Sequence, residues 1–155
     1  MSVHDERKSL LREFFREVWN AGDTAASAKY LAPAYVIAHD PGDPWDGQEL
    51  DLEGFQERVR QSRAPFPDQR FEIQTMLADR DAVAVSWTWT GTHRADLPGF
   101  PATHREVRMS GITIYLFQGL QLRGHWQVTD RLAVLQQLRL GPLEVDAEAD
   151  VGPPN

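Results

Sequence analysis

The chain has 155 residues, a formal net charge of −7 and no cysteine. This length favours one domain with a sizeable core, and the lack of cysteine excludes disulfides, thiolate metal sites and cysteine nucleophiles. The acidic charge argues against nucleic-acid binding, which needs a basic surface. The sequence contains no run of about 18 apolar residues, so we expect no membrane span. Because the N-terminus has no apolar signal segment, we expect a cytoplasmic protein.

The first part of the chain has helical periodicity. Apolar residues such as Leu11 and Phe14 recur at the spacing of one helix face. Asp23 or Thr24 can cap a second, short helix, which Pro33 is expected to end. The predicted helices cover residues 5–19, about 24–30 and 51–62, with a short strand at 35–39 and a Pro/Gly loop at 40–48.

The second part of the chain has the period-two alternation of strands. Phe71, Ile73 and Leu77 alternate with polar neighbours, and Asp79–Asp81 reads as a turn. A loop rich in Pro and Gly at 95–104 separates the second predicted strand from the third. The predicted strands cover residues 71–77, 82–93, 106–117 and 120–129.

Helices followed by hairpin-linked strands predict an α+β fold with an antiparallel sheet. A strongly curved sheet wrapped around the N-terminal helices forms a cone-shaped barrel, and we expect an internal pocket that is mostly apolar with few polar groups. This domain is expected to cover residues 1–140. Residues 141–155 are rich in Pro, Gly and acidic side chains and predict a flexible acidic tail.

A single acid, Asp130, ends an apolar and aromatic strand. Residues two apart in a strand share a face, so Trp126, Val128 and Asp130 point the same way. If that face is buried, Asp130 lies at the rim of an apolar pocket, where desolvation raises its pKa toward the range useful for proton transfer. Asp130 can also cap the helical turn that follows it, and the two roles can coexist. His125 has the opposite parity and is expected on the other face.

Two further histidines stand at strand ends. His39 precedes the 40–48 loop, where it can bind a substrate oxygen or assist proton transfer, or simply bond to loop backbone. His93 ends the long strand and is expected at the pocket mouth, or as a hydrogen-bonded residue of the strand end.

Several tryptophans offer flat surfaces that suit a polycyclic ligand, although large aromatic residues more often belong to a core or an interface. Trp45 lies in a polar loop with little core to join, so we expect it to act as a lid or a dimer contact. The tryptophans expected on sheet faces are Trp87, Trp89 and Trp126.

The order of these elements and several local motifs resemble one family over about residues 8–140. The chain is similar to SnoaL-like polyketide cyclases, cone-shaped α+β proteins of the nuclear-transport-factor-like superfamily. The motifs that carry the resemblance are Val18–Asp23, His39-Asp40-Pro41, Phe66-Pro67-Asp68, Gly91-Thr92-His93, Pro98–Thr103, His125-Trp126 with Asp130, and Gln137-Leu138.

The resemblance implies an intramolecular aldol ring closure on an aromatic polyketide, with Asp130 as general acid/base. It implies no metal or other cofactor, because the conjugated carbonyls of the substrate delocalise the enolate charge. One position departs from the pattern: Leu116 stands where many relatives carry His or Arg on the neighbouring strand. This departure leaves room for another reaction, such as partnering a hydroxylation in polyketide tailoring.

Two other function classes stay open, a non-catalytic protein that binds a hydrophobic small molecule and an interaction module. The strands carry bulky residues on both faces, and the helices can cover only one of them. Large exposed apolar patches are rare in monomers, so we predict a homodimer or higher homo-oligomer.

Overall fold

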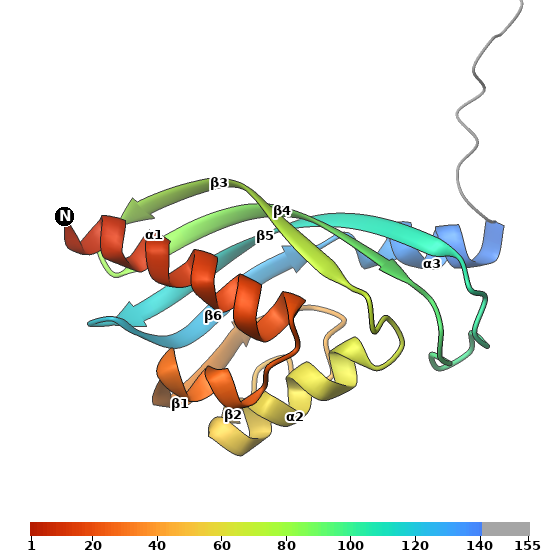
Figure 1. Cartoon of the computed structure of the whole chain (residues 1–155), viewed down its shortest axis with the longest axis horizontal. Helices are drawn as coiled ribbons and strands as arrows, with labels where there is room; N and C mark the ends of the chain where they lie inside the picture. The colour runs from red at the N-terminus through yellow and green to blue at the C-terminus, as the bar shows by residue number, and fades with distance from the viewer. Residues whose placement is uncertain (141–155) are drawn as a thin grey trace, which may run out of the picture.

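The computed structural model describes residues 1–140, which form three α-helices and one six-stranded sheet (Figure 1). The expected acidic tail, residues 141–155, lies outside the described residues. The helical segments are α1 (Val3–Phe14), the π-helix η1 (Phe15–Asn20), the 3₁₀-helix η2 (Ala25–Lys29), α2 (Leu52–Arg63) and α3 (Arg131–Leu140). The strands are β1 (Leu31–His39), β2 (Glu49–Leu50), β3 (Arg70–Asp79), β4 (Ala82–Thr92), β5 (Glu106–Gln118) and β6 (Gln121–Thr129).

The strands follow the order β2-β1-β6-β5-β4-β3 in a curved sheet, with β2 and β3 at its edges. The sheet arches over α1 and α2, which lie beneath its concave side (Figure 1). This arrangement confirms the predicted α+β cone-shaped fold. One pair differs from the antiparallel expectation, because β1 runs parallel to β6. β1 belongs to the helical part of the chain, so no tight hairpin fixes its direction relative to β6.

One local expectation is wrong, and one helix differs in type along part of its length. β1 begins at Leu31, so Pro33 lies inside a strand and does not end a helix. Pro33 is exposed and falls where the pairing with β6 shifts register, a place where a proline without an N–H is tolerated. The predicted first helix changes into η1, in which the Ala21 N–H donates to the Arg16 carbonyl at 2.9 Å, a spacing of five residues.

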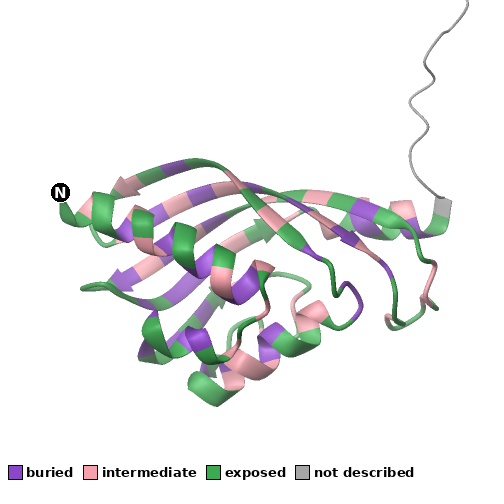
Figure 2. Cartoon of the chain, in the orientation of Figure 1, coloured by how far each residue is buried: buried purple, intermediate pink, exposed green. Residues whose placement is uncertain are grey.

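Burial alternates along the strands, which shows which side chains face the interior (Figure 2). β6 presents His125 to the interior with 2% of its surface exposed, whereas Trp126 and Val128 face outward with 42% and 52% exposed. No helix within residues 1–140 has the length and apolarity needed to cross a membrane. The buried inward residues of β4 and β5 are Val83, Val85, Trp87, Trp89, Val107, Thr113, Tyr115 and Phe117.

Candidate functional site

Asp130 lies on the outer face of the sheet, at the junction of β6 and α3. The residue is exposed, and its Oδ1 accepts the backbone N–H of Ala133 at 3.1 Å. Trp126 and Val128 share this face, as the parity predicts, but the face is exposed. The expectation that Asp130 borders an interior pocket is therefore wrong, and its geometry is that of a helix cap.

His39 and Leu116 also turn away from the interior. The His39 ring stacks on the exposed Trp126 ring, with the centroids 4.4 Å apart and the planes at 11°. The pairing of β1 with β6 shifts register between Ile37 and His39, which turns His39 outward. Leu116 is half-buried on the outward parity of β5, so it does not occupy a position inside a pocket.

Trp87 and Trp89 point inward and are buried, with 2% and 3% of their surfaces exposed. Trp87 Nε1 donates to Thr113 Oγ1 at 2.9 Å, and Trp89 Nε1 donates to Gln69 Oε1 at 3.2 Å. Each indole N–H thus has a protein partner, and both rings pack in the core cluster.

His93 and Trp45 contact the interior from loop ends. His93 is fully buried, and its Nδ1 accepts the backbone N–H of Thr103 at 3.2 Å. Its Nε2 has no hydrogen-bond partner among the described residues. Trp45 is half-buried and packs against the core, while its backbone N–H donates to Asp43 Oδ1 at 2.9 Å.

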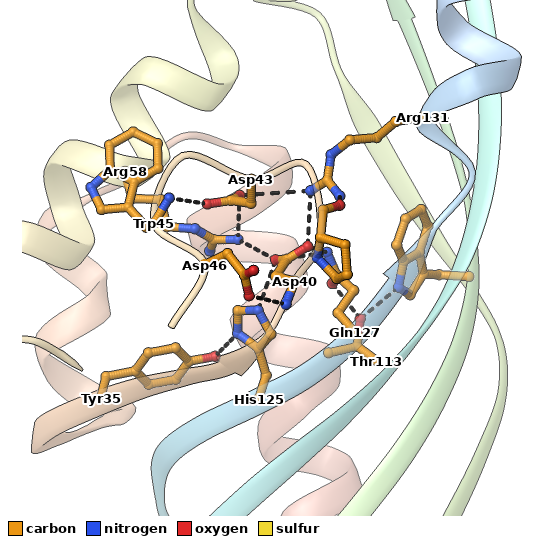
Figure 3. A network of polar contacts seen from close by, with 12 residues as sticks. Tyr35, Asp40, Asp43, Trp45, Asp46, Arg58, Thr113, His125, Gln127 and Arg131 are labelled. Atoms are coloured by element: carbon orange, nitrogen blue, oxygen red, sulfur yellow. Dashed lines mark hydrogen bonds and ion pairs between the residues drawn. The ribbon is translucent and has the colours of Figure 1, made fainter. Parts of the chain in front are cut away.

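The interior has a polar centre at Asp40, the residue that follows β1 (Figure 3). Asp40 is the one buried acidic residue in the part of the chain whose burial is described. Its Oδ2 accepts His125 Nε2 at 2.9 Å and a terminal nitrogen of Arg58 at 3.1 Å, and its Oδ1 accepts a terminal nitrogen of Arg131 at 3.0 Å. Gln127 Nε2 adds a contact of 3.2 Å. Side chains from β6, α2 and α3 therefore converge on one carboxylate.

A chain of two hydrogen bonds leads from Asp40 to a tyrosine hydroxyl. Because the ionised Asp40 carboxylate can only accept, His125 donates to it from Nε2. Nδ1 of the neutral ring is then an acceptor, and it lies 2.7 Å from the hydroxyl oxygen of Tyr35. The order Tyr35–His125–Asp40 matches the logic of a hydroxyl, an imidazole and an orienting carboxylate in nucleophilic triads.

A second polar branch reaches Asp40 along neighbouring strands. The Thr113 hydroxyl donates to Gln127 Oε1 at 2.6 Å, and Gln127 in turn donates to Asp40. Thr113 and Gln127 are directly paired across β5 and β6. The Trp87 indole N–H donates to Thr113, so every hydrogen bond of this branch runs toward the carboxylate.

The charges around Asp40 keep it ionised. Burial raises the pKa of Asp40, but the hydrogen bond from His125 and the charges of Arg131 and Arg58 lower it below its ordinary value. Asp43 lies 3.1 Å from Arg58, so two acids face two arginines. Burial lowers the pKa of His125 and outweighs its bond to Asp40, which keeps the ring neutral near pH 7. Burial also raises the pKa of Tyr35 well above its ordinary value.

A model of the SnoaL-like polyketide cyclase family matches residues 9–138. The chain belongs to this family. The 130 matched positions extend from α1 to α3 and include every residue of the Asp40 centre. No curated protein matches the chain at a significant level.

Solved structures extend the likeness of this SnoaL-like protein. A proposed polyketide cyclase from Acidithiobacillus ferrooxidans is 55% identical, with a TM-score of 0.86 over 91% of this chain and 99% of that one. IdmH, a proposed polyketide cyclase from Streptomyces antibioticus, is 25% identical, with a TM-score of 0.73 over 86% of this chain and 98% of that one. AclR, a proposed hydroxylase from Streptomyces galilaeus, is 24% identical with a TM-score of 0.74 over 87% and 85% of the two chains, and shows the fold alone.

The acidic and histidine side chains of this SnoaL-like domain are not grouped as metal ligands. Within residues 1–140, no three His, Asp or Glu side chains gather in a group that could hold a metal ion. Asp40, His125 and Tyr35 form a hydrogen-bonded set in the interior, a type of arrangement that can take part in proton transfer.

Proposed function

We propose that this SnoaL-like protein catalyses an intramolecular aldol ring closure on a polyketide-type substrate, and that Tyr35, His125 and Asp40 carry its proton transfer. The observation behind the proposal is the hydrogen-bonded order of these three groups in a largely apolar interior. The family match supports the reaction class, and the buried carboxylate supports the choice of residues.

The proton steps balance within the three residues. The Tyr35 oxygen takes a proton from the carbon next to a substrate carbonyl, while the hydroxyl proton of Tyr35 moves to His125 Nδ1. The imidazolium that forms is stabilised by the ionised Asp40 at Nε2. The enolate carbon attacks the second carbonyl and closes the ring, and the proton returns from His125 through Tyr35 to the new alkoxide. Conjugated carbonyls of the substrate delocalise the enolate charge, so the steps require no further group.

Access to the centre requires a movement of its cover. Tyr35 and His125 have 1% and 2% of their surfaces exposed. Arg131 ties α3 to the 40–48 loop, since its guanidinium donates to the Pro41 carbonyl at 2.7 Å and to Asp40. With 32% of its side chain exposed, Arg131 is more exposed than Arg58 and His125, the other side chains that pair with the Asp40 carboxylate in ion-pair geometry. We expect release of this arm to open the centre, on the time scale of loop motions in enzymes.

Asp130 is the alternative candidate for the acid/base group, because the family resemblance predicts that role for it. Its position on the outer face and its bond to the Ala133 N–H favour capping. The two assignments give opposite results in one experiment. Tyr35→Phe removes only the hydroxyl, whereas Asp130→Asn keeps the size of the side chain and removes its acid/base capacity.

The test measures turnover of an aromatic polyketide methyl ester that closes a ring by an aldol step. We expect Tyr35→Phe to lower kcat by about 10²–10⁴, the range of a general acid/base group, and Asp130→Asn to retain most of the activity. Tyr30→Phe is the matched control. The Tyr30 hydroxyl donates to Glu17 at 3.0 Å and forms no hydrogen bond to the Asp40 centre. Thermal melting of each variant separates lost chemistry from lost folding.

The other outcomes decide against the proposal. A full loss of activity in Asp130→Asn with normal melting, and none in Tyr35→Phe, assigns the chemistry to Asp130. A parent protein that binds the ester without converting it is a small-molecule binding protein. A parent that converts it only with an added reductase is a hydroxylation partner.

A further inference from the structure

A surface hollow lies between the α1–η1 segment and the edge strand β3, and no residue of the Asp40 centre lines it. Its volume is about 400 Å³, and its lining includes Arg12, Phe15, Asn20, Arg70 and Phe71. A second hollow of about 330 Å³ shares Arg16, Asn20 and Arg70 with it, so the two adjoin. Volumes of roughly 300–1,000 Å³ are typical of small-molecule sites.

The hollow is built by a rare local conformation. η1 is a π-helix, and π-helical turns are frequent at functional sites. It ends at Asn20, whose side-chain amide brackets the backbone of Phe71: Nδ2 donates to the Phe71 carbonyl at 3.0 Å, and Oδ1 accepts the Phe71 N–H at 2.7 Å. This pair of bonds fixes the width of the hollow where β3 has no strand neighbour.

The hollow combines aromatic side chains with guanidinium groups. Phe15 and Phe71 meet edge to face with their centroids 5.5 Å apart, and both line the hollow. Arg12 and Arg70 also line it, and neither side chain forms a hydrogen bond or ion pair to any residue within 1–140. Glu72 is the one acid in the lining of the larger hollow.

Arg16 differs from the other two arginines because it already has acidic partners. Its guanidinium pairs with Glu13 and lies 3.4 Å from Glu17. The positive charge available to a ligand therefore comes from Arg12 on α1 and Arg70 at the start of β3. Guanidinium groups match the geometry of a carboxylate.

We propose that this hollow is a binding site for a small organic anion with a flat aromatic body and a carboxylate. The aromatic body packs on the half-buried Phe71 and Ile73 side chains of the lining, and the carboxylate pairs with Arg12 and Arg70. The site is separate from the Asp40 centre, so the proposal does not depend on the reaction proposed above.

The test uses 2-naphthoate and its uncharged analogue 2-naphthamide as probes of the full chain in calorimetric titrations. We expect 2-naphthoate to bind with one site per chain and the amide to bind about fivefold more weakly, because an exposed ion pair contributes up to about 1 kcal/mol. Arg70→Gln and Arg12→Gln should each weaken 2-naphthoate by a similar factor and leave the amide unchanged. The side-chain amide signal of Asn20 in NMR spectra should shift on titration.

The matched control is Arg60→Gln, which removes one positive charge from α2 outside the lining of either hollow. Equal weakening in Arg60→Gln and Arg70→Gln would show that only net charge matters and would overturn the site. Equal affinity for the two probes, or no saturable binding of 2-naphthoate, would overturn it as well. Asp40→Asn should bind 2-naphthoate like the parent, which keeps the result independent of the Asp40 centre.

Discussion

Asp40→Asn is the substitution whose effect on stability follows most directly from the structure. It removes the negative charge that His125, Arg58 and Arg131 share and leaves the Arg58 guanidinium, 6% exposed, beside a neutral amide. Breaking a buried ion pair by removing one partner costs about 3–5 kcal/mol. We expect the lower end, about 3 kcal/mol, because Asp43 stays 3.1 Å from Arg58 and the new amide oxygen can still accept.

The assay is urea unfolding at pH 7, with thermal melting beside it. A loss of about 3 kcal/mol corresponds to a fall in Tm of about 6–12 °C for a domain of this size. The control is Asp130→Asn, which keeps a good helix cap and should change stability by less than about 0.5 kcal/mol. A loss below about 1 kcal/mol in Asp40→Asn would refute the view that Asp40 holds the buried charges together.

The contribution of Asp40 to the free energy of unfolding should depend on pH in a direction that follows from its pKa. The folded pKa of Asp40 is lowered, so its contribution to stability is complete above the ordinary Asp pKa of about 3.9. It is lost as the pH falls through the lowered folded pKa. The part of the difference between the parent and Asp40→Asn that comes from the titration of Asp40 itself should therefore be constant from neutral pH down to about 4 and shrink only below it.

Three further predictions concern the interior and the outer face. The pKa of His125 is lowered by burial, so stability should fall as the pH drops below about 6.5, and His125→Gln should remove this slope in unfolding titrations. We expect light scattering at micromolar concentration to report a mass near twice 17.6 kDa, because Trp126 and Val128 are exposed on the outer face. Trp126→Glu should give the monomer mass, and a monomeric parent protein would contradict the prediction. Gly111→Ala should destabilise the fold by about 1–3 kcal/mol in urea unfolding, because the added Cβ would lie 2.5 Å from the Trp87 ring, and an unchanged midpoint would show that the ring gives way.

The strand pattern of the sequence predicts the α+β fold and the parity of its residues, since both depend on local periodicity. Trp126 and Asp130 do share a face, and His125 does lie on the opposite one. Periodicity cannot show which face is inside when both carry apolar residues. Aromatic content made the Trp126 face the better choice for the interior, yet the buried face is the one with His125, because Asp40 supplies a partner for the polar side chains there.

The parts that sequence reasoning missed depend on contacts distant along the chain. Asp40 appears in the His39-Asp40-Pro41 motif, but its burial requires a register shift between β1 and β6 and cations from α2 and α3. The available sequence signal for Asp40 was its position as an acid directly after a strand and before a loop rich in Pro and Gly. The π-helix of η1 has no comparable signal, because helical periodicity continues through Phe15 and Val18.

The most direct test of the account follows proton transfer itself, through deuterium uptake from D₂O by an aryl ketone that cannot close a ring. The account predicts that the parent protein and Asp130→Asn catalyse exchange of the hydrogen next to the carbonyl, whereas Tyr35→Phe is slower by about 10²–10⁴. Exchange that persists in Tyr35→Phe and disappears in a folded Asp130→Asn would contradict the account and place the chemistry on the outer face of the sheet.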